Sequence, residues 1–535
     1  MQTKPEPEPE PDDSQGASSR ARRLDARVTA WFAADRKRRW WVLVLFVAAL
    51  IVRLHWNLSV HPLGSFLYSD MKGYWGRADA LLDNPFSVRE YDAFFPFGTT
   101  WLVAAVKLLF GRETLVPIAI LYAIFGASIV AASYAIADRV IGARAPWVAP
   151  AVGLFLLVYY PLVAIGGYLL SELPFCFCLM ISVLLLIRLV DDDARPRHAW
   201  LLGIMLGLGS WIRPQLILSV ALIGSYWLIM RLAFRRRERE NPYAKLGWVQ
   251  IGRIAVPLLL LLSVASIRFY IHTDKLGLVS GNSGINLVFG RCHNKGIYAR
   301  PDGKGHGTVR FSPPPLIQLE AHSAAKPDAL ITSRSVWGDY PEPVADVPGF
   351  AVDEYGCTRR KCRQPGSEIE YRGYIGDAEI HRKIVRACIE RGGFKRQAYF
   401  TLSHWVMLWN HNMMWPDQAN PRPRSKAKRE TWRHRQFVWA RVHRGLLMVP
   451  ALLALGFVFG PRRWPKQALV ALNLWALLIV VGIWFGGIRF RVPYDPIITL
   501  LAGFTLALAW EQLVIKFRAR RAAKATADHQ PKRDS

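Results

Sequence analysis

Acidic residues are scarce in this chain, and the resulting positive charge is unevenly distributed. Its 535 residues contain 69 Lys and Arg against 40 Asp and Glu, which gives a formal charge of +29. No nucleic-acid-binding motif accompanies the excess, so the charge does not indicate a nucleic-acid partner. The basic clusters instead abut long apolar runs, at 36–39, 235–237, 462–463 and 516–521. This pattern is typical of loops retained in the cytoplasm, with attraction to anionic lipid as a secondary effect.

Cysteine is also scarce, with six residues in the chain. Two lie within an apolar run and are expected to be small core residues. The other four fall in one long polar stretch and are disulfide candidates with open pairing if that stretch faces an oxidising compartment. These candidates are Cys292, Cys357, Cys362 and Cys388. The chain has no His, Asp and Glu cluster with metal-ligand spacing, so it predicts no metal and no cofactor.

Internal repeats and a cleavable signal peptide are missing as well. The absence of repeats disfavours a transporter built from two related halves. The first apolar run begins about forty residues into the chain and has a basic flank, so we expect a retained membrane anchor. The preceding segment, 1–35, is rich in Pro and Glu and is expected to be a disordered cytoplasmic tail.

Apolar residues are what the chain has in abundance, at 52% of the total, and they are bunched. A bilayer core needs about 20 helical residues, and segments near this length recur at 40–57, 96–111, 115–136, 147–165, 169–190, 199–212, 213–231, 252–271, 441–460, 467–486 and 492–515. They predict an all-α polytopic membrane protein of about 10–11 hydrophobic helices. We expect interfacial helices in the first external loop and one large external loop.

Basic flanks predict a cytoplasmic N-terminus, with the short connection 486–491 and the loops 58–95 and 272–438 outside. An even number of spans must separate these loops, so one of the segments between them, 96–111 or 199–212, is not a full crossing. The predicted division is a transmembrane module at 36–271, a large external loop at 272–438, C-terminal helices at 439–515 and a basic tail at 516–535. We expect a location in the cell (inner) membrane, with the large loop periplasmic. The acidic run 191–193 then falls inside, as a solvated loop.

Two amphipathic stretches lie in the predicted external loops. Residues 71–82 place Met71, Tyr74 and Ala78 on one face, with Lys72 and Arg77 on the other. Residues 378–409 predict two helices broken at 392–393, with apolar and aromatic faces. Such helices lie in the membrane interface, and Asp70 precedes the first one.

These features together resemble the type C glycosyltransferase superfamily, most closely its protein mannosyltransferase and aminoarabinose transferase branch. The family's first external loop has an acidic residue followed by Tyr and Ala, here Asp70, Tyr74 and Ala78. Further family motifs follow in order between 50 and 515: FFPFGTTWLVAAVKLLFG at 94–111, SE at 171–172, GIMLGLGSWIRP at 203–214, GNSGINLVFG at 281–290 and RFRVP at 489–493. Many relatives carry a second acid after the first, where this chain has Met71, and a Lys near the place of His404.

The resemblance implies an enzyme that takes a sugar from a polyprenyl-phosphate donor, inverts its anomeric carbon and needs no metal. It implies that Asp70 is the general base, although an N-cap role for the next helix is the alternative. Glu172 is a second acid that orients a partner, or a first-turn residue favoured by the helix dipole. Candidates for binding the donor phosphate are Arg489, Arg491, Arg213 and His404, and candidates for binding sugar or acceptor are Tyr74, Asn282 and Asn286. Arg268 and His272, at the outer end of 252–271, are further candidates.

The predicted function is therefore transfer of a sugar from a polyprenyl-phosphate-linked donor to a hydroxyl of a protein, lipid or glycan. The partners are that donor, a hydroxyl-bearing acceptor and the lipid bilayer, with no nucleic acid. Three alternatives remain at this point: a transporter or flippase of lipid-linked sugars, a polysaccharide polymerase or ligase, and a membrane scaffold without catalysis.

Overall fold

The computed structural model describes residues 35–67, 70–191, 195–237, 240–291, 298–301, 307–310, 378–409, 441–484 and 486–528. The N-terminal half contains α2 (Asp35–His55), η1 (Trp56–Val60), η2 (Leu63–Phe66), α3 (Asp70–Asp83), α4 (Glu90–Phe94), α5 (Gly98–Phe110), α6 (Val116–Ile141), α7 (Val148–Val158), α8 (Tyr160–Ala164), η3 (Ile165–Gly167), α9 (Glu172–Val190), α10 (Pro196–Ile212), α11 (Leu216–Ala233) and α12 (Trp248–Thr273).

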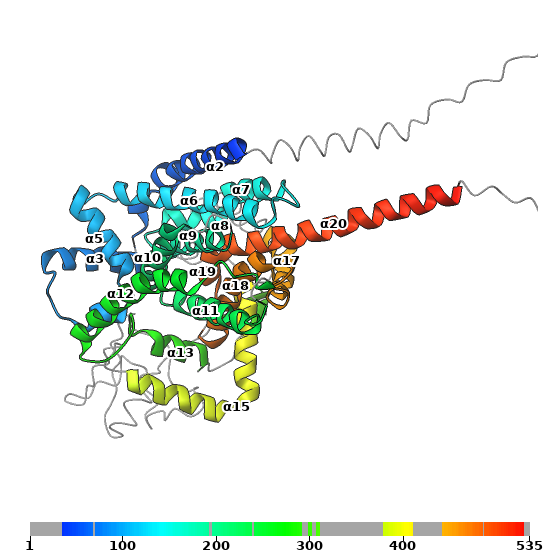
Figure 1. Cartoon of the computed structure of the whole chain (residues 1–535). Helices are drawn as coiled ribbons and strands as arrows, with labels where there is room; N and C mark the ends of the chain where they lie inside the picture. Colours follow the sequence, from blue (N-terminus) through cyan, green and yellow to red (C-terminus); the bar gives the residue numbers. More distant parts are fainter. Residues whose placement is uncertain are drawn as a thin grey trace, which may run out of the picture.

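The remaining elements are α13 (Ser283–Arg291), β1 (Tyr298–Pro301), β2 (Gly307–Arg310), α15 (Ala378–Trp409), η7 (His443–Met448), α17 (Val449–Leu453), η8 (Ala454–Phe459), α18 (Pro465–Ile483), α19 (Ile488–Arg491), η9 (Val492–Tyr494) and α20 (Asp495–Asp528). The two strands form one short antiparallel pair, with Tyr298 opposite Arg310. Helices otherwise make up the bundle shown in Figure 1, from which α20 extends well beyond the other elements.

Seven described helices are long and apolar enough to cross a membrane. Together, α7, α8 and η3 are also apolar enough, but they are bent by 53°, as in a broken span or a re-entrant loop. The other three predicted apolar segments form shorter elements: α5, with 13 residues, α10, with 17, and the broken helix 443–459. The prediction of an all-α polytopic membrane protein is therefore confirmed. At 1.5 Å per residue, α5 is about 20 Å long, short of a bilayer core of about 30 Å. Its length agrees with the topology in which 96–111 does not cross.

The spans α6, α9 and α18 form the centre of the bundle, where most of their residues are buried. Around them, α2, α11 and α12 expose much of their apolar surface, as expected for helices that face lipid. The small residues of α6, among them Gly126, Ala127 and Ala132, allow neighbouring helices to approach closely.

A buried arginine supports the bend between α7 and α8. Pro161 has no N–H to donate to the carbonyl of Leu157, which would leave that acceptor without its helical partner. The Arg53 guanidinium, 2% exposed, donates to the carbonyl oxygens of Leu156 at 3.2 Å and Leu157 at 3.5 Å. Arg53 therefore satisfies backbone groups freed by the bend, and the chain then continues through η3 to the start of α9.

Replacing Gly126 by Ala is expected to destabilise the bundle by about 1–3 kcal/mol, because overpacking a close contact forces shifts. A Cβ at Gly126 would lie 2.5 Å from Cδ and Nε of Arg53, whose guanidinium is held by hydrogen bonds to three carbonyls. The free energy of unfolding in mixed micelles is the measurement. Gly224→Ala in α11 is the matched control, because nothing lies within 4 Å of its new Cβ; a Gly126→Ala protein as stable as the control would contradict the argument.

The two predicted interfacial stretches form helices, but they pack against protein. In α3, Met71, Tyr74 and Ala78 are buried in the main hydrophobic core rather than facing lipid. The long helix α15 is broken at Gly393, whose φ is 64°, and Figure 1 shows its two arms at an angle. Its second arm donates to carbonyls of α18, from Thr401 to Gly482 at 3.0 Å and from Trp405 to Leu478 at 2.9 Å. This arm therefore runs antiparallel to α18, a candidate membrane span.

Candidate active site

Two carboxylates and two guanidinium groups meet where several helix ends converge. Arg489 pairs with Asp70 at 2.8 Å through Nη1 and with Glu172 through Nε. Arg213 donates to the same Glu172 carboxylate at 2.5 Å and to the Ser171 hydroxyl at 3.0 Å. Asp70 begins α3, Glu172 begins α9, Arg213 follows α10 and Arg489 lies in α19. The four charges cancel, and they come from segments far apart in the sequence.

Helix polarity explains part of this convergence. Since α9 and α10 are neighbouring helices joined by a short connection, the start of α9 and the end of α10 lie together. Glu172 thus sits at the positive end of one helix dipole and Arg213 at the negative end of another, both favourable positions. The Arg213 guanidinium also lies 5.6 Å from the ring centroid of Phe490. The pair is therefore built into the ends of two core helices.

A second ion pair holds α3 in place. Lys107 of α5 is buried, donates to the Asp79 carboxylate at 2.6 Å and lies 3.3 Å from the centroid of the Trp75 ring. Helical spacing places Asp79 on the polar face of α3, where the sequence predicts solvent and not a buried partner. A Lys inside an apolar helix is the signal that would have indicated a partner. This pair fixes the helix that begins at Asp70.

The charged groups of the cluster differ in how far they are exposed. The side chain of Glu172 is 0% exposed, whereas those of Asp70 and Arg489 are 22% and 21% exposed. Asp70 and Arg489 are therefore partly accessible from outside, while the Glu172 carboxylate is enclosed and pairs with both arginines. Tyr74, one turn after Asp70, is buried beside them. Burial raises the pKa of its phenol, and the charges of Asp70 and Glu172 raise it further.

Arg491 does not join this cluster, although it lies two residues from Arg489. Its guanidinium pairs with Asp495 at 3.0 Å and donates to the carbonyl of Leu408 at 3.0 Å, and neither Arg491 nor Asp495 is exposed. The contacts link α19 to α20 and to the end of α15. Arg491 therefore anchors α19 to these two helices.

His404 is also engaged by the backbone. Its Nδ1 accepts the amide N–H of Gly486 at 3.2 Å, so Nε2 carries the proton and donates to the carbonyl of Gly290 at 3.0 Å. The ring thereby joins α15, α13 and the turn before α19. Asn282 immediately precedes α13 and Asn286 lies within it. Asn282 accepts a hydrogen bond from the Ser280 hydroxyl at 3.1 Å.

Other predicted residues fall elsewhere. Cys292, Cys357 and Cys362 lie outside the described residues, and so does the side chain of Cys388 on α15. Within the acidic run 191–193, Asp191 pairs with Arg139 and Lys466, and its two successors lie outside the described residues.

Comparison with known proteins supports the resemblance seen in the motifs. The family model described as dolichyl-phosphate-mannose-protein mannosyltransferase matches residues 95–260, just under a third of the chain. The matched segment contains Glu172 and Arg213 but neither Asp70 nor Arg489. The resemblance to the type C glycosyltransferase superfamily is confirmed by this match. A search of curated proteins gave no match.

Two solved structures are similar to the chain. The apo oligosaccharyltransferase of Archaeoglobus fulgidus is 12% identical, with a TM-score of 0.45; the match covers 92% of this chain and 52% of the archaeal one. ArnT from Cupriavidus metallidurans, bound to undecaprenyl phosphate, is 14% identical, with a TM-score of 0.34 and coverage of 86% and 77%. The chain thus spans about half the length of the oligosaccharyltransferase that it matches.

Proposed function

We propose that the chain is an integral-membrane glycosyltransferase that moves a sugar from a polyprenyl-phosphate donor to a hydroxyl acceptor at the outer face of the membrane. The observation that carries the proposal is the cluster of Asp70, Glu172, Arg213 and Arg489 at the helix ends. A partly exposed carboxylate beside a guanidinium suits this reaction, which needs a base for the acceptor and a cation for the leaving phosphate.

Asp70 is the general base in this proposal. Its carboxylate takes the proton of the acceptor hydroxyl as the acceptor oxygen forms a bond to the anomeric carbon. The bond between that carbon and the donor phosphate oxygen breaks, and the electron pair leaves with the phosphate. Attack from the face opposite the phosphate inverts the anomeric carbon.

Arg489 is the residue proposed to hold the phosphate, since the guanidinium fork matches two phosphate oxygens. It now lies 2.8 Å from Asp70, and a donor phosphate would compete with Asp70 for it. Binding of the donor would thus release the Asp70 carboxylate for its role as base. Glu172 and Arg213, which pair at 2.5 Å, keep Arg489 in position throughout.

The neighbours of the remaining predicted residues suggest a role for each of them. Tyr74, next to Asp70, is proposed to contact the acceptor or sugar. Asn282, just before α13, and Asn286, within it, are proposed to contact the sugar. Arg491 and His404, whose polar groups bind the protein backbone and Asp495, are proposed to support the site.

A transfer assay tests the function directly. The full chain in lipid nanodiscs is given radiolabelled polyprenyl-phosphate sugars or the same sugars as nucleotide donors, with a membrane extract as acceptor. Transfer of label from the lipid-linked donors alone is expected. Movement of the labelled lipid between leaflets without any covalent transfer would instead establish a flippase and overturn the proposal.

A further inference from the structure

The last helix, α20, is longer than a membrane span requires. A bilayer core takes about 20 of its 34 residues, which leaves about 20 Å of helix at 1.5 Å per residue. We call this part, residues 515–528, the α20 extension, and Figure 1 shows it projecting from the bundle. The headgroup region on each side of a bilayer is only about 5–8 Å thick. Most of the extension therefore lies beyond the lipid of a membrane that α20 crosses.

The α20 extension is exposed and basic. Each of its residues from 515 to 521 is exposed, and residues 516–524 contain five cations and no carboxylate. Arg521 lies 4.6 Å from the ring centroid of Phe517, on the same helix. Among the described side chains, no carboxylate pairs with the cations Lys516, Arg518, Arg520 and Arg521.

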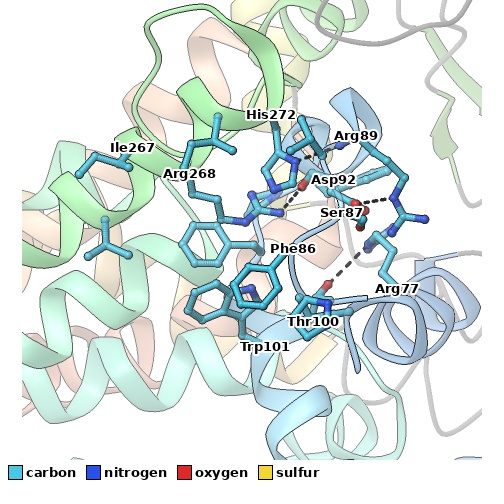
Figure 2. Close-up of a pocket in the computed structure, with 18 residues that line it drawn as sticks. Arg77, Phe86, Ser87, Arg89, Asp92, Thr100, Trp101, Ile267, Arg268 and His272 are labelled. Atoms are coloured by element: carbon cyan, nitrogen blue, oxygen red, sulfur yellow. Dashed lines mark hydrogen bonds and ion pairs between the residues drawn. The ribbon is translucent and has the colours of Figure 1, made fainter. Parts of the chain in front are cut away.

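A second basic region of the protein shows the contrast. Figure 2 shows a cavity of about 360 Å³ between the loop 84–89, the start of α5 and the end of α12. There Arg89 pairs with the Asp92 carboxylate at 2.8 Å, and Arg268 donates to the Asp92 carbonyl at 2.8 Å. Nδ1 of His272 accepts the backbone N–H of Arg89 at 3.1 Å. These arginines have acidic or carbonyl partners within the fold, whereas a carboxylate for the α20 extension must come from outside the described residues.

The α20 extension lies on the side of the bundle where α2 begins. Because α18 and α20 are consecutive spans, α20 ends on the side where α18 starts. At that start, Lys466 pairs with Asp191, which also pairs with Arg139 in the last turn of α6. Arg38 of α2 pairs with Asp138 of the same turn at 3.4 Å. Figure 1 likewise shows the start of α2 and the end of α20 on one side.

An acidic segment precedes α2 in the sequence. Residues 6–13, EPEPEPDD, contain five carboxylates and no cation, in a chain with only 40 acidic residues among 535. The residues 14–34, which join this segment to α2, can reach up to about 70 Å when extended. That reach exceeds the whole length of α20, about 51 Å. The acidic segment can therefore contact the α20 extension of its own chain.

We propose that the α20 extension binds the acidic segment 6–13 of the same chain. Five carboxylates face five cations in this pairing. Alternating Glu and Pro favour the polyproline II conformation, in which every second residue lies about 6 Å further along. Lys516 and Arg520, four residues apart on α20, are separated by the same rise of about 6 Å. Because both segments belong to one chain, the effective concentration of the acidic segment is high. The contact does not depend on the transfer reaction.

Carbodiimide cross-linking tests the contact in the full chain. The reagent joins a carboxylate to a neighbouring Lys amine with loss of water, and the linked peptides are identified by mass spectrometry. In phosphatidylcholine nanodiscs that hold one chain each, we expect links between the segment 6–13 and Lys516 or Lys524. Exposed ion pairs are screened by salt, so the links should disappear at about 1 M salt, where the Debye length is about 3 Å.

The charge-reversed variant Arg520→Glu, Arg521→Glu keeps both reactive lysines and should reduce the yield of links about tenfold. The matched control is Arg235→Glu, Arg236→Glu, which makes the same charge change at exposed residues after α11 and should leave the yield unchanged. Equal losses in the two variants, or links that survive about 1 M salt, would overturn the proposal. It would also be overturned if added phosphatidylglycerol abolished the links, which would assign the α20 extension to the bilayer. Links found only with two chains per nanodisc would assign it to a second copy and have the same consequence.

Discussion

Transfer of sugar by the Asp70→Asn protein is expected to be about 100 to 10,000 times slower than by the wild type, the usual contribution of a general base. Asn has nearly the shape of Asp but cannot take the acceptor proton. The pairing of Arg489 with Glu172 and of Arg213 with Glu172 is untouched by the change. The helices should therefore remain folded, and the loss should appear in the rate of the chemical step under saturating donor.

The matched control for this change lies at the other end of the same helix. Asp83 of α3 pairs with Arg112 where both side chains are about half exposed or more. Such surface pairs contribute about 0–1 kcal/mol, so Asp83→Asn should keep both its activity and its stability. Full activity in the Asp70→Asn protein would leave Asp70 as a helix N-cap and remove it from the mechanism.

Sequence reasoning could identify the residues of the cluster because each sits at an unusual place for a charge. Glu172 adjoins a long apolar run, and Arg489 lies in a short connection predicted to be external, where arginine is disfavoured. The helical spacing of the apolar residues in 71–82 placed Asp70 at the start of a helix, where α3 begins. Helix periodicity and charge placement are local properties, so the sequence carried them.

What the sequence could not separate was Arg489 from Arg491. Both were candidates for binding phosphate, and only the packing of α19 between α9, α15 and α20 directs one toward Glu172 and the other toward Asp495. The sequence also could not tell whether the apolar face of α3 contacts lipid or protein. The same apolar residues are found in both environments. The cavity at Arg268 depends on a loop and α12, which are far apart in sequence, so no local pattern predicted it.

The pairing of Arg491 with Asp495 predicts a large effect on stability. Arg491→Met should lower the free energy of unfolding by about 3–5 kcal/mol, because it leaves the Asp495 carboxylate charged and buried without its partner. Both side chains of this pair are fully buried. The double variant Arg491→Met, Asp495→Leu should regain most of that stability, since an apolar pair of similar volume often replaces a buried ion pair at little cost. Unfolding in mixed micelles measures both.

Arg489→Gln provides the contrast, because it should reduce transfer strongly while leaving most of the stability. Glu172 keeps its pair with Arg213 at 2.5 Å in that variant, so no buried carboxylate loses every partner. If Arg491→Met were as stable as the wild type, Arg491 would not anchor α19. If the double variant were folded and stable but inactive, Arg491 would act on the substrate itself. The proposal that Arg489 binds phosphate while Arg491 only anchors α19 would then be wrong.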